Sequence, residues 1–196
     1  MTSLLININW RDGVKLTEEE EEYKVEFPGL KGPHFKITVC GEPSVGKTTL
    51  VRNFTGKQLR DEYIPTLGVE ITTKKLKVRG KEVTLIIWDL AGQPQFKIVR
   101  PLYYKGSAAA VFMFDVTMPH TLARIDDWVN ECYNVIDGAP AILIGNKIDL
   151  KEERLVDRST AEARASRLGL QYFEASAKLG QNIGPSLLWL VARILR

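Results

Sequence analysis

Residues 41–49 read GEPSVGKTT, and they determine what kind of domain this chain can form. Four residues separate Gly41 from Gly46, and Lys47 and Thr48 follow the second glycine. The preceding FKITVC has the composition of a strand, and the following TTLVRNFTG has that of a helix. In such a strand–loop–helix unit the backbone N–H groups of the loop converge on phosphate oxygens, which the positive end of the helix dipole also attracts.

This pattern predicts a loop that binds the phosphates of a nucleoside triphosphate together with Mg²⁺. The Lys47 ammonium would neutralise the β- and γ-phosphates, and the Thr48 hydroxyl would ligate Mg²⁺. A chance glycine-rich turn is the alternative, which the combination of strand, helix, Lys and Thr disfavours. The residues expected at the phosphates are Gly41, Ser44, Val45, Gly46, Lys47, Thr48 and Thr49.

The base is indicated by NKID at residues 146–149, which end and follow an apolar run. The Asp149 carboxylate can accept hydrogen bonds from the ring N1–H and the exocyclic amine of guanine, a donor pair that adenine lacks. Lys147 can lay its aliphatic stem along the base, and Asn146 can tie this loop to the phosphate loop. The motif is short, but it lies where a strand ends, and open α/β sheets bind ligands there. A P-loop kinase or ATPase, which would need adenine, is the alternative.

Apolar strand-like runs alternate with helix-like segments from Phe35 onward. The short runs AAAVFMFDV and PAILIGNK are typical of buried parallel strands, and ITTKKLKVRGKEVTLIIWDL predicts two strands joined at Arg79-Gly80. Residues 121–136 predict one helix, because their apolar residues recur at three- and four-residue steps. Those apolar residues are Leu122, Ile125, Val129, Cys132 and Ile136. The alternation predicts a parallel sheet covered by helices on both faces, and it disfavours a helical bundle.

The first 33 residues stand apart from this pattern. They carry four basic and seven acidic side chains, a net charge of −3, which leaves +6 for residues 34–196 of a chain whose total is +3. LLININW and EYKVEF could each form a strand on either side of the acidic run Glu18–Glu22, so a small β-hairpin is expected. We read the acidic run as a solvated turn, with docking on the basic domain as the alternative. The expected organisation is an N-terminal extension over 1–33 and one domain over 34–196.

Composition and end sequences exclude several classes of partner. The net charge of +3 is too small to indicate nucleic acid, and no apolar stretch is long enough for a membrane span. The start lacks the features of a signal peptide, and neither terminus offers a lipidation motif, so no direct lipid anchor is expected. Cys40 and Cys132 lack metal-ligand spacing and are expected to be buried free thiols. We expect a cytoplasmic monomer that either works in the soluble phase or is recruited to membranes by a partner.

Together with two further motifs, these features resemble the Ras superfamily of small GTPases over residues 35–196. The further motifs are YIPTLGVEI, which contains Thr66, and WDLAGQ at residues 88–93. YIPTLGVEI, WDLAGQPQF, LYYKGSAAAVFMFDVT and GNKIDL are most similar to the Rab branch, with some Arf-like character in WDLAGQP. The resemblance implies a P-loop NTPase G domain, an α/β fold with a mostly parallel six-stranded sheet and helices on both faces.

The resemblance also implies roles for residues near the γ-phosphate. Thr66 should close over that phosphate and give Mg²⁺ a second protein ligand, and Asp89 should hold the metal through water. The Gly92 N–H should bond the γ-phosphate, and Gln93 should orient the attacking water. The implied metal-binding residues are thus Thr48, Thr66 and Asp89.

A second base-binding loop is implied at EASAK, residues 174–178, which follows another short apolar segment. The backbone N–H of Ala177 is expected to meet the guanine carbonyl oxygen. Ser176 and Lys178 are expected to brace the loop.

Several residues depart from the family pattern. Pro43 and Ser44 fill the two loop positions where Ras has glycines, and because proline lacks an N–H and fixes φ, we expect an altered hydrolysis rate. Leu59 stands where Ras has an aromatic residue that stacks beside the guanine, and this difference predicts faster nucleotide exchange. Tyr63 stands where heterotrimeric G-protein α subunits carry a catalytic arginine, so intrinsic hydrolysis should be slow, on the order of 10⁻⁴ to 10⁻³ s⁻¹.

The resemblance implies a molecular switch that binds GTP and GDP with Mg²⁺ and hydrolyses GTP to GDP and phosphate. It also implies an exchange factor, a GTPase-activating protein and effector proteins as partners. A module that holds a guanine nucleotide without cycling is the alternative. The presence of Gln93, Thr66 and Asp89 argues against that alternative.

Overall fold

The structure is a computed structural model that describes residues 32–58, 65–78 and 80–195. The hairpin predicted within residues 1–33 and the acidic run Glu18–Glu22 lie outside the described residues. The same is true of Leu59 and Tyr63, so the expectations attached to these two residues stay predictions.

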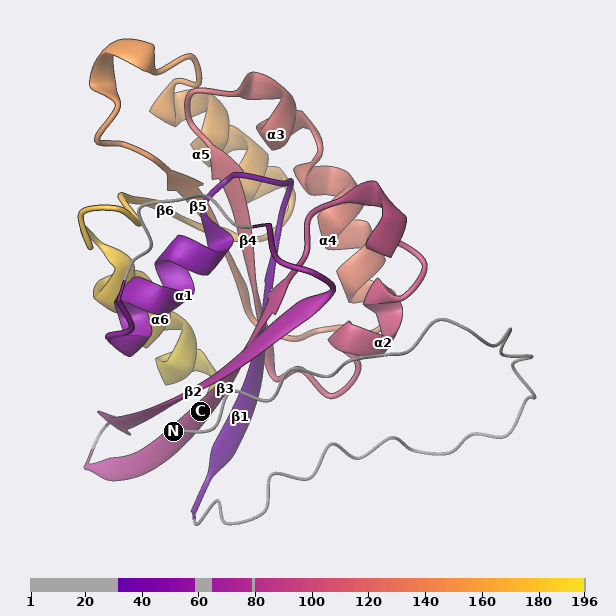
Figure 1. The fold of residues 1–196 in the computed structure, drawn as a ribbon, viewed down its shortest axis with the longest axis vertical. Helices are drawn as coiled ribbons and strands as arrows, with labels where there is room; N and C mark the ends of the chain where they lie inside the picture. Colours follow the sequence, from indigo (N-terminus) through magenta and orange to yellow (C-terminus); the bar gives the residue numbers. More distant parts are fainter. Residues whose placement is uncertain (1–31, 59–64, 79, 196) are drawn as a thin grey trace.

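The core of the molecule is a six-stranded sheet with the strand order β2-β3-β1-β4-β5-β6 (Figure 1). The strands are β1 (His34–Cys40), β2 (Val69–Val78), β3 (Lys81–Leu90), β4 (Ala109–Asp115), β5 (Ala141–Asn146) and β6 (Gln171–Ala175). Only the β2–β3 pair is antiparallel; β1 pairs in parallel with both β3 and β4, and β5 pairs in parallel with both β4 and β6. The predicted α/β fold class and mostly parallel sheet are confirmed.

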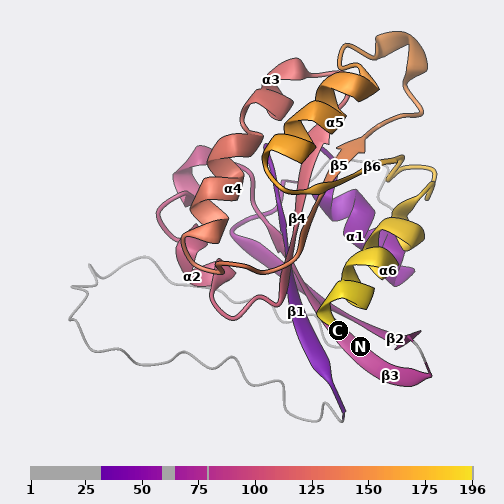
Figure 2. The same ribbon diagram turned by 180° about the vertical axis from the view of Figure 1, so that it is seen from behind.

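Helices cover both faces of this sheet (Figures 1 and 2). They are α1 (Lys47–Thr55), α2 (Arg100–Tyr104), α3 (Pro119–Ala123), α4 (Ile125–Tyr133), α5 (Arg158–Arg167) and α6 (Ile183–Ile194), with short 3₁₀ turns at Pro94–Phe96 and Lys151–Glu153. Helices α1 and α6 lie on one face, and α2 to α5 lie on the other (Figures 1 and 2). The two layers follow from the βαβ connections, because each crossover must pack its helix on one side of the sheet.

The single helix predicted over residues 121–136 is in fact two, α3 and α4. They meet at Arg124 (φ −82°, ψ −8°), whose carbonyl accepts from the N–H of Asp127 three residues on as well as from that of Trp128 four residues on. The apolar face of the segment was predicted correctly. All five of its residues are buried: Leu122, Ile125, Val129, Cys132 and Ile136.

The hydrophobic core consists of two clusters, one on each face of the sheet. Every residue of β4 and β5 is buried, which explains why their sequences are continuous apolar runs and do not alternate. Cys40 and Cys132 belong to the cluster under α4, and both are buried and free, as predicted. Within the described ranges, no helix combines the length and the apolar character that crossing a bilayer requires.

Leu143 at the centre of β5 provides a test of this core. Its side chain is fully buried, so Leu143→Ala should lower the free energy of unfolding by about 2–5 kcal/mol through lost burial and a residual cavity. Urea denaturation at constant nucleotide content would measure the change. The control is Leu155→Ala, because Leu155 is 69% exposed and its truncation should change stability by less than about 0.5 kcal/mol. Equal losses in the two variants would contradict the packing described.

Candidate functional site

The predicted site residues gather where β1, β3, β5 and β6 end. Because these strands run parallel to one another, their carboxyl ends share one edge of the sheet. The phosphate loop connects β1 to α1, residues 146–149 follow from β5, and residues 176–178 follow β6. Loops that are far apart in sequence therefore meet at one place.

Asn146 joins the phosphate loop to the loop after β6. Its buried side-chain amide donates from Nδ2 to the Val45 carbonyl at 2.7 Å, and its Oδ1 accepts from the Ala177 N–H at 2.9 Å. Gly46 has φ +97°, and a Cβ at that position would collide with the Asn146 amide. A glycine is required at residue 46 for both reasons.

The Ala177 N–H has a partner that the sequence did not predict. We expected it to meet a guanine carbonyl, and in the structure it donates to Asn146. It could serve the guanine only as a donor shared between two acceptors. The Ala177 carbonyl in turn accepts from Asn53 Nδ2 on α1 at 3.3 Å, so the loop is held at two points. Ser176 also braces this loop, since its hydroxyl accepts from the Leu179 N–H at 3.1 Å.

Lys47 places a buried ammonium inside the phosphate loop. Its Nζ donates to the carbonyls of Gly41 and Glu42, each at 2.8 Å. Burial lowers the pKa of Lys47 to about 8, an effect that the nearby Asp89 carboxylate opposes. The ammonium is therefore surrounded by backbone oxygen atoms and would gain from an anion beside it.

Thr48, Thr66 and Asp89 come together although they are widely spaced in the sequence. The Thr48 hydroxyl donates to Asp89 Oδ2, and its oxygen lies 2.9 Å from the Thr66 hydroxyl. Asp89 is buried, which raises the pKa of its carboxyl to about 6, and Lys47 opposes this shift. Its Oδ1 is buried without a hydrogen-bond partner in the part of the chain that the structure describes. This set of three oxygen donors with one unsatisfied carboxylate oxygen fits Mg²⁺, which prefers oxygen ligands.

Gly92 lies directly against the phosphate loop. A Cβ at this position would be 2.5 Å from the Pro43 nitrogen and 2.6 Å from the Glu42 carbonyl carbon. Only a glycine allows the loop after β3 to approach the phosphate loop so closely. The next residue, Gln93, is partly buried, and its side-chain Oε1 has no partner among residues 32–58, 65–78 and 80–195.

The residues after β5 that are predicted to bind the base have one partner that the sequence analysis missed. Lys147 adopts φ +69°, and its ammonium pairs with the fully buried carboxylate of Asp115 at the end of β4. Asp149 Oδ1 is buried and lacks a partner within the described ranges. Asp115 could have been predicted, because it is a polar residue that ends an apolar parallel strand, as Asn146 does and as Asp89 nearly does, one residue before the end of β3.

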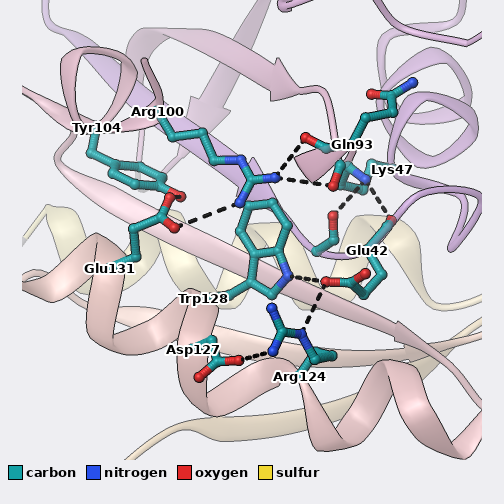
Figure 3. A network of polar contacts seen from close by, with 11 residues as sticks. Glu42, Lys47, Gln93, Arg100, Tyr104, Arg124, Asp127, Trp128 and Glu131 are labelled. Carbon is teal, nitrogen blue, oxygen red and sulfur yellow. Dashed lines mark hydrogen bonds and ion pairs between the residues drawn. The ribbon is translucent and has the colours of Figure 1, made fainter. Parts of the chain in front are cut away.

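The sequence analysis also missed a polar network beside the phosphate loop, shown in Figure 3. Arg100 of α2 donates to the carbonyls of Gly92 and Gln93, and Trp128 of α4 donates to the Glu42 side chain. Arginine in a short helix is ordinarily a solvated residue, and nothing in the spacing of these residues indicated a contact.

The Asn146 bridge yields a stability test. Asn146→Ala should leave the Val45 carbonyl and the Ala177 N–H buried without partners, and should lower the free energy of unfolding by about 2–4 kcal/mol. Chemical denaturation would measure this loss. Asn134→Ala is the matched control, since Asn134 is exposed at the end of α4 and should cost less than about 0.5 kcal/mol. A loss at Asn146 no larger than the control would show that the bridge is energetically unimportant.

Comparison with known proteins identifies the family. The Ras family profile matches residues 36–196. The chain is 37% identical over 162 residues to Ras-related protein Rab-21 of Mus musculus, covering 82% of this chain and 73% of that protein. It is 35% identical over 161 residues to GTP-binding protein YPTM1 of Zea mays (82% and 77%) and 32% identical over 162 residues to Ras-related protein Rab-13 of Bos taurus (82% and 80%). The chain therefore belongs to the Ras family and is a Rab-like small GTPase.

Proposed function

We propose that this small GTPase binds GTP and GDP with Mg²⁺ at the edge of the sheet described above, and that the residues gathered there carry out its switch cycle. The observation that carries the proposal is the Asn146 side chain, which fixes the phosphate loop and the two base-binding loops to one another. A single nucleoside triphosphate that contacts all three loops would place its polyphosphate on the first and its base on the other two. The similarity to a protein named as GTP-binding supports a guanine nucleotide.

Guanine recognition is assigned to Asp149. Its buried Oδ1 is an acceptor without a donor among the residues that the structure describes, and guanine offers two adjacent N–H donors. Leaving such an acceptor unpaired against adenine would cost a few kcal/mol, about 1–3 for a neutral group and more for a charged one. The Asp115–Lys147 ion pair would hold the lysine stem beside the base.

Mg²⁺ is assigned to Thr48, Thr66 and Asp89, whose oxygen atoms converge. When bound, the ion would neutralise charge on the β- and γ-phosphates. Lys47 would add its positive charge at the same phosphates from within the loop.

Hydrolysis is assigned to Gln93. Its side-chain oxygen, which has no partner in the described part of the chain, could accept a hydrogen bond from a water molecule and orient that water toward the γ-phosphorus. The water oxygen would form the new P–O bond as the bond to the bridging β–γ oxygen breaks, which yields GDP and inorganic phosphate. The Gly92 N–H would bond the γ-phosphate, so loss of that phosphate would release the loop.

The switch would be read by other proteins through the loops that bear Thr66 and Gln93. Large apolar side chains follow both loops and are strongly exposed: Leu67 is 80% exposed, Ile98 86% and Leu102 66%. Exposed apolar side chains indicate a protein-binding surface where they form one contiguous patch. We assign them to effectors and regulators, with an exchange factor and a GTPase-activating protein as the expected regulators.

Substitution of Gln93 tests the enzymatic role. Wild-type protein loaded with GTP and Mg²⁺ should release phosphate slowly, at about 10⁻⁴ to 10⁻³ s⁻¹. Gln93→Leu should slow release by about tenfold or more, because the water loses its orienting acceptor. Gln171→Leu is the control, since Gln171 is exposed at the start of β6. Retention of GTP without release by the wild type would instead favour a module that never cycles.

Substitution of Asp149 tests the base assignment. Asp149→Asn should weaken GTP binding at least about tenfold and favour xanthosine triphosphate, which presents an acceptor where guanine presents its amine. Competition against a fluorescent guanine nucleotide would measure both affinities. The exposed Asp137→Asn should leave the preference unchanged. If ATP displaced GTP from the wild type, the guanine assignment would be wrong.

A further inference from the structure

Arg100 is a buried positive charge with several specific partners. It begins α2, and only 5% of it is exposed. One terminal nitrogen of its guanidinium donates to the Gly92 carbonyl at 3.0 Å and to the Gln93 carbonyl at 2.9 Å. The other terminal nitrogen lies 3.6 Å from a Glu131 carboxylate oxygen, and the guanidinium carbon lies 3.8 Å from the centre of the Trp128 ring. A buried charge is costly without such partners, so its location is tightly specified.

Trp128 connects this guanidinium to the phosphate loop. Its ring face contacts Arg100, while its indole N–H donates to Glu42 Oε1 at 2.9 Å. Glu42 follows the first glycine of the loop, and its backbone carbonyl accepts from Lys47. Figure 3 shows the indole between the guanidinium and the Glu42 carboxylate, with Arg124 near the same carboxylate oxygen, Oε1, that accepts from the indole.

Glu131 holds α2 from the opposite side. Its second carboxylate oxygen accepts from the Tyr104 hydroxyl at 2.8 Å, so both buried residues of α2 contact the same glutamate of α4. Burial raises the pKa of Tyr104, and the neighbouring Glu131 carboxylate raises it further. The phenol therefore stays protonated and remains a donor, which keeps Glu131 in position to face Arg100.

The two carbonyls that Arg100 binds belong to the two peptide planes on either side of the Gln93 Cα. Fixing both planes fixes φ and ψ of Gln93, which are −65° and 142°. The plane after Gln93 ends at Pro94, which has no N–H, so its carbonyl is the only hydrogen-bonding group by which it can be held. On its other side the loop is limited by the contact between Gly92 and Pro43.

From this arrangement we infer that Arg100 is a positioning residue for hydrolysis, which fixes the backbone of Gln93 so that its side chain points at the reacting phosphate. The inference rests on the proposed function, because it assigns Arg100 to the same reaction. The guanidinium itself acts through Gln93 and does not contact the nucleotide. Through Trp128 and Glu42, the same residue places Gln93 relative to the phosphate loop.

The alternative is a purely structural role, in which Arg100 only attaches α2 to α4. The two roles differ in their dependence on Gln93. If Arg100 acts through Gln93, then its removal has no further effect on hydrolysis once the Gln93 side chain has been replaced. If it only attaches the helix, then the two losses should be independent and multiply.

The test compares single-turnover GTP hydrolysis and nucleotide dissociation in wild type, Arg100→Met, Gln93→Leu and the double variant. Arg100→Met should slow hydrolysis by about tenfold and change nucleotide affinity by less than about twofold, because misplacing a catalytic group lowers the rate of the chemical step. In the Gln93→Leu background, the Arg100→Met substitution should slow hydrolysis no further. The control is Arg164→Met, which removes a half-buried arginine that pairs with Asp126. Unchanged hydrolysis in Arg100→Met, or multiplicative losses in the double variant, would overturn the inference.

Hydrogen exchange of the amides in residues 91–99 separates this inference from the proposed function. Exchange there should be faster in Arg100→Met than in wild type, and unchanged exchange would overturn the positioning role whether or not GTP is cleaved. Absence of hydrolysis by the wild type would overturn the proposed function and, with it, any role of Arg100 in hydrolysis, whereas hydrolysis by the wild type that is unchanged in Arg100→Met would overturn the inference alone. If the Met variant does not fold, Arg100→Lys keeps the buried charge but loses the planar fork and is expected to show the same changes.

Discussion

Burial of the Lys47 ammonium and the Asp89 carboxylate at one end of the sheet is the constraint on which the site depends. Burial raises the pKa of Asp89 to about 6, so the folded state binds that proton more tightly than the unfolded chain, and the free energy of unfolding falls as pH rises from about 4 to about 6. Burial lowers the pKa of Lys47 to about 8, so the free energy of unfolding falls as pH drops from about 10 to about 8. Near neutral pH both groups are charged, so the burial of each lowers the free energy of unfolding. Under the proposed function, phosphates beside Lys47 and Mg²⁺ beside Asp89 would compensate these buried charges, and ligand binding would stabilise the protein.

Much of this site follows from local sequence because polar residues end apolar strands. Asp89 and Leu90 are the last two residues of β3, and Asn146 is the last residue of β5. The phosphate loop begins directly after β1. Parallel pairing places such strand ends at one edge, so a sequence that shows where strands stop also shows which polar residues converge. The continuous apolar runs of β4 and β5 made the parallel sheet predictable, because strands buried on both faces do not alternate.

The features that sequence reasoning missed depend on contacts between distant residues. The break at Arg124 interrupts a segment whose apolar spacing is that of one continuous helix. The Ala177 N–H donates to the side chain of Asn146, 31 positions earlier in the sequence. The Trp128 indole donates to Glu42, 86 positions earlier. A buried arginine can be recognised only after its partners are known, because the residue type alone favours a solvated position.

Under the proposed function, the attachment of α2 would explain how a tightly held loop can also act as a switch. Within this five-residue helix the buried residues are Arg100 and Tyr104, and the polar groups of both meet Glu131 of α4. Tyr104 anchors the end of the helix in the hydrophobic core, whereas the start is held by the charged and polar contacts of Arg100 and Leu102 is exposed, so the start is the part that loosens once those contacts are lost. Arg100 binds the carbonyls of Gly92 and Gln93, so movement of Gly92 away from the phosphate loop would pull on the same guanidinium that secures the helix. The loop and the start of α2 should therefore be held or released together, because one side chain is shared between them.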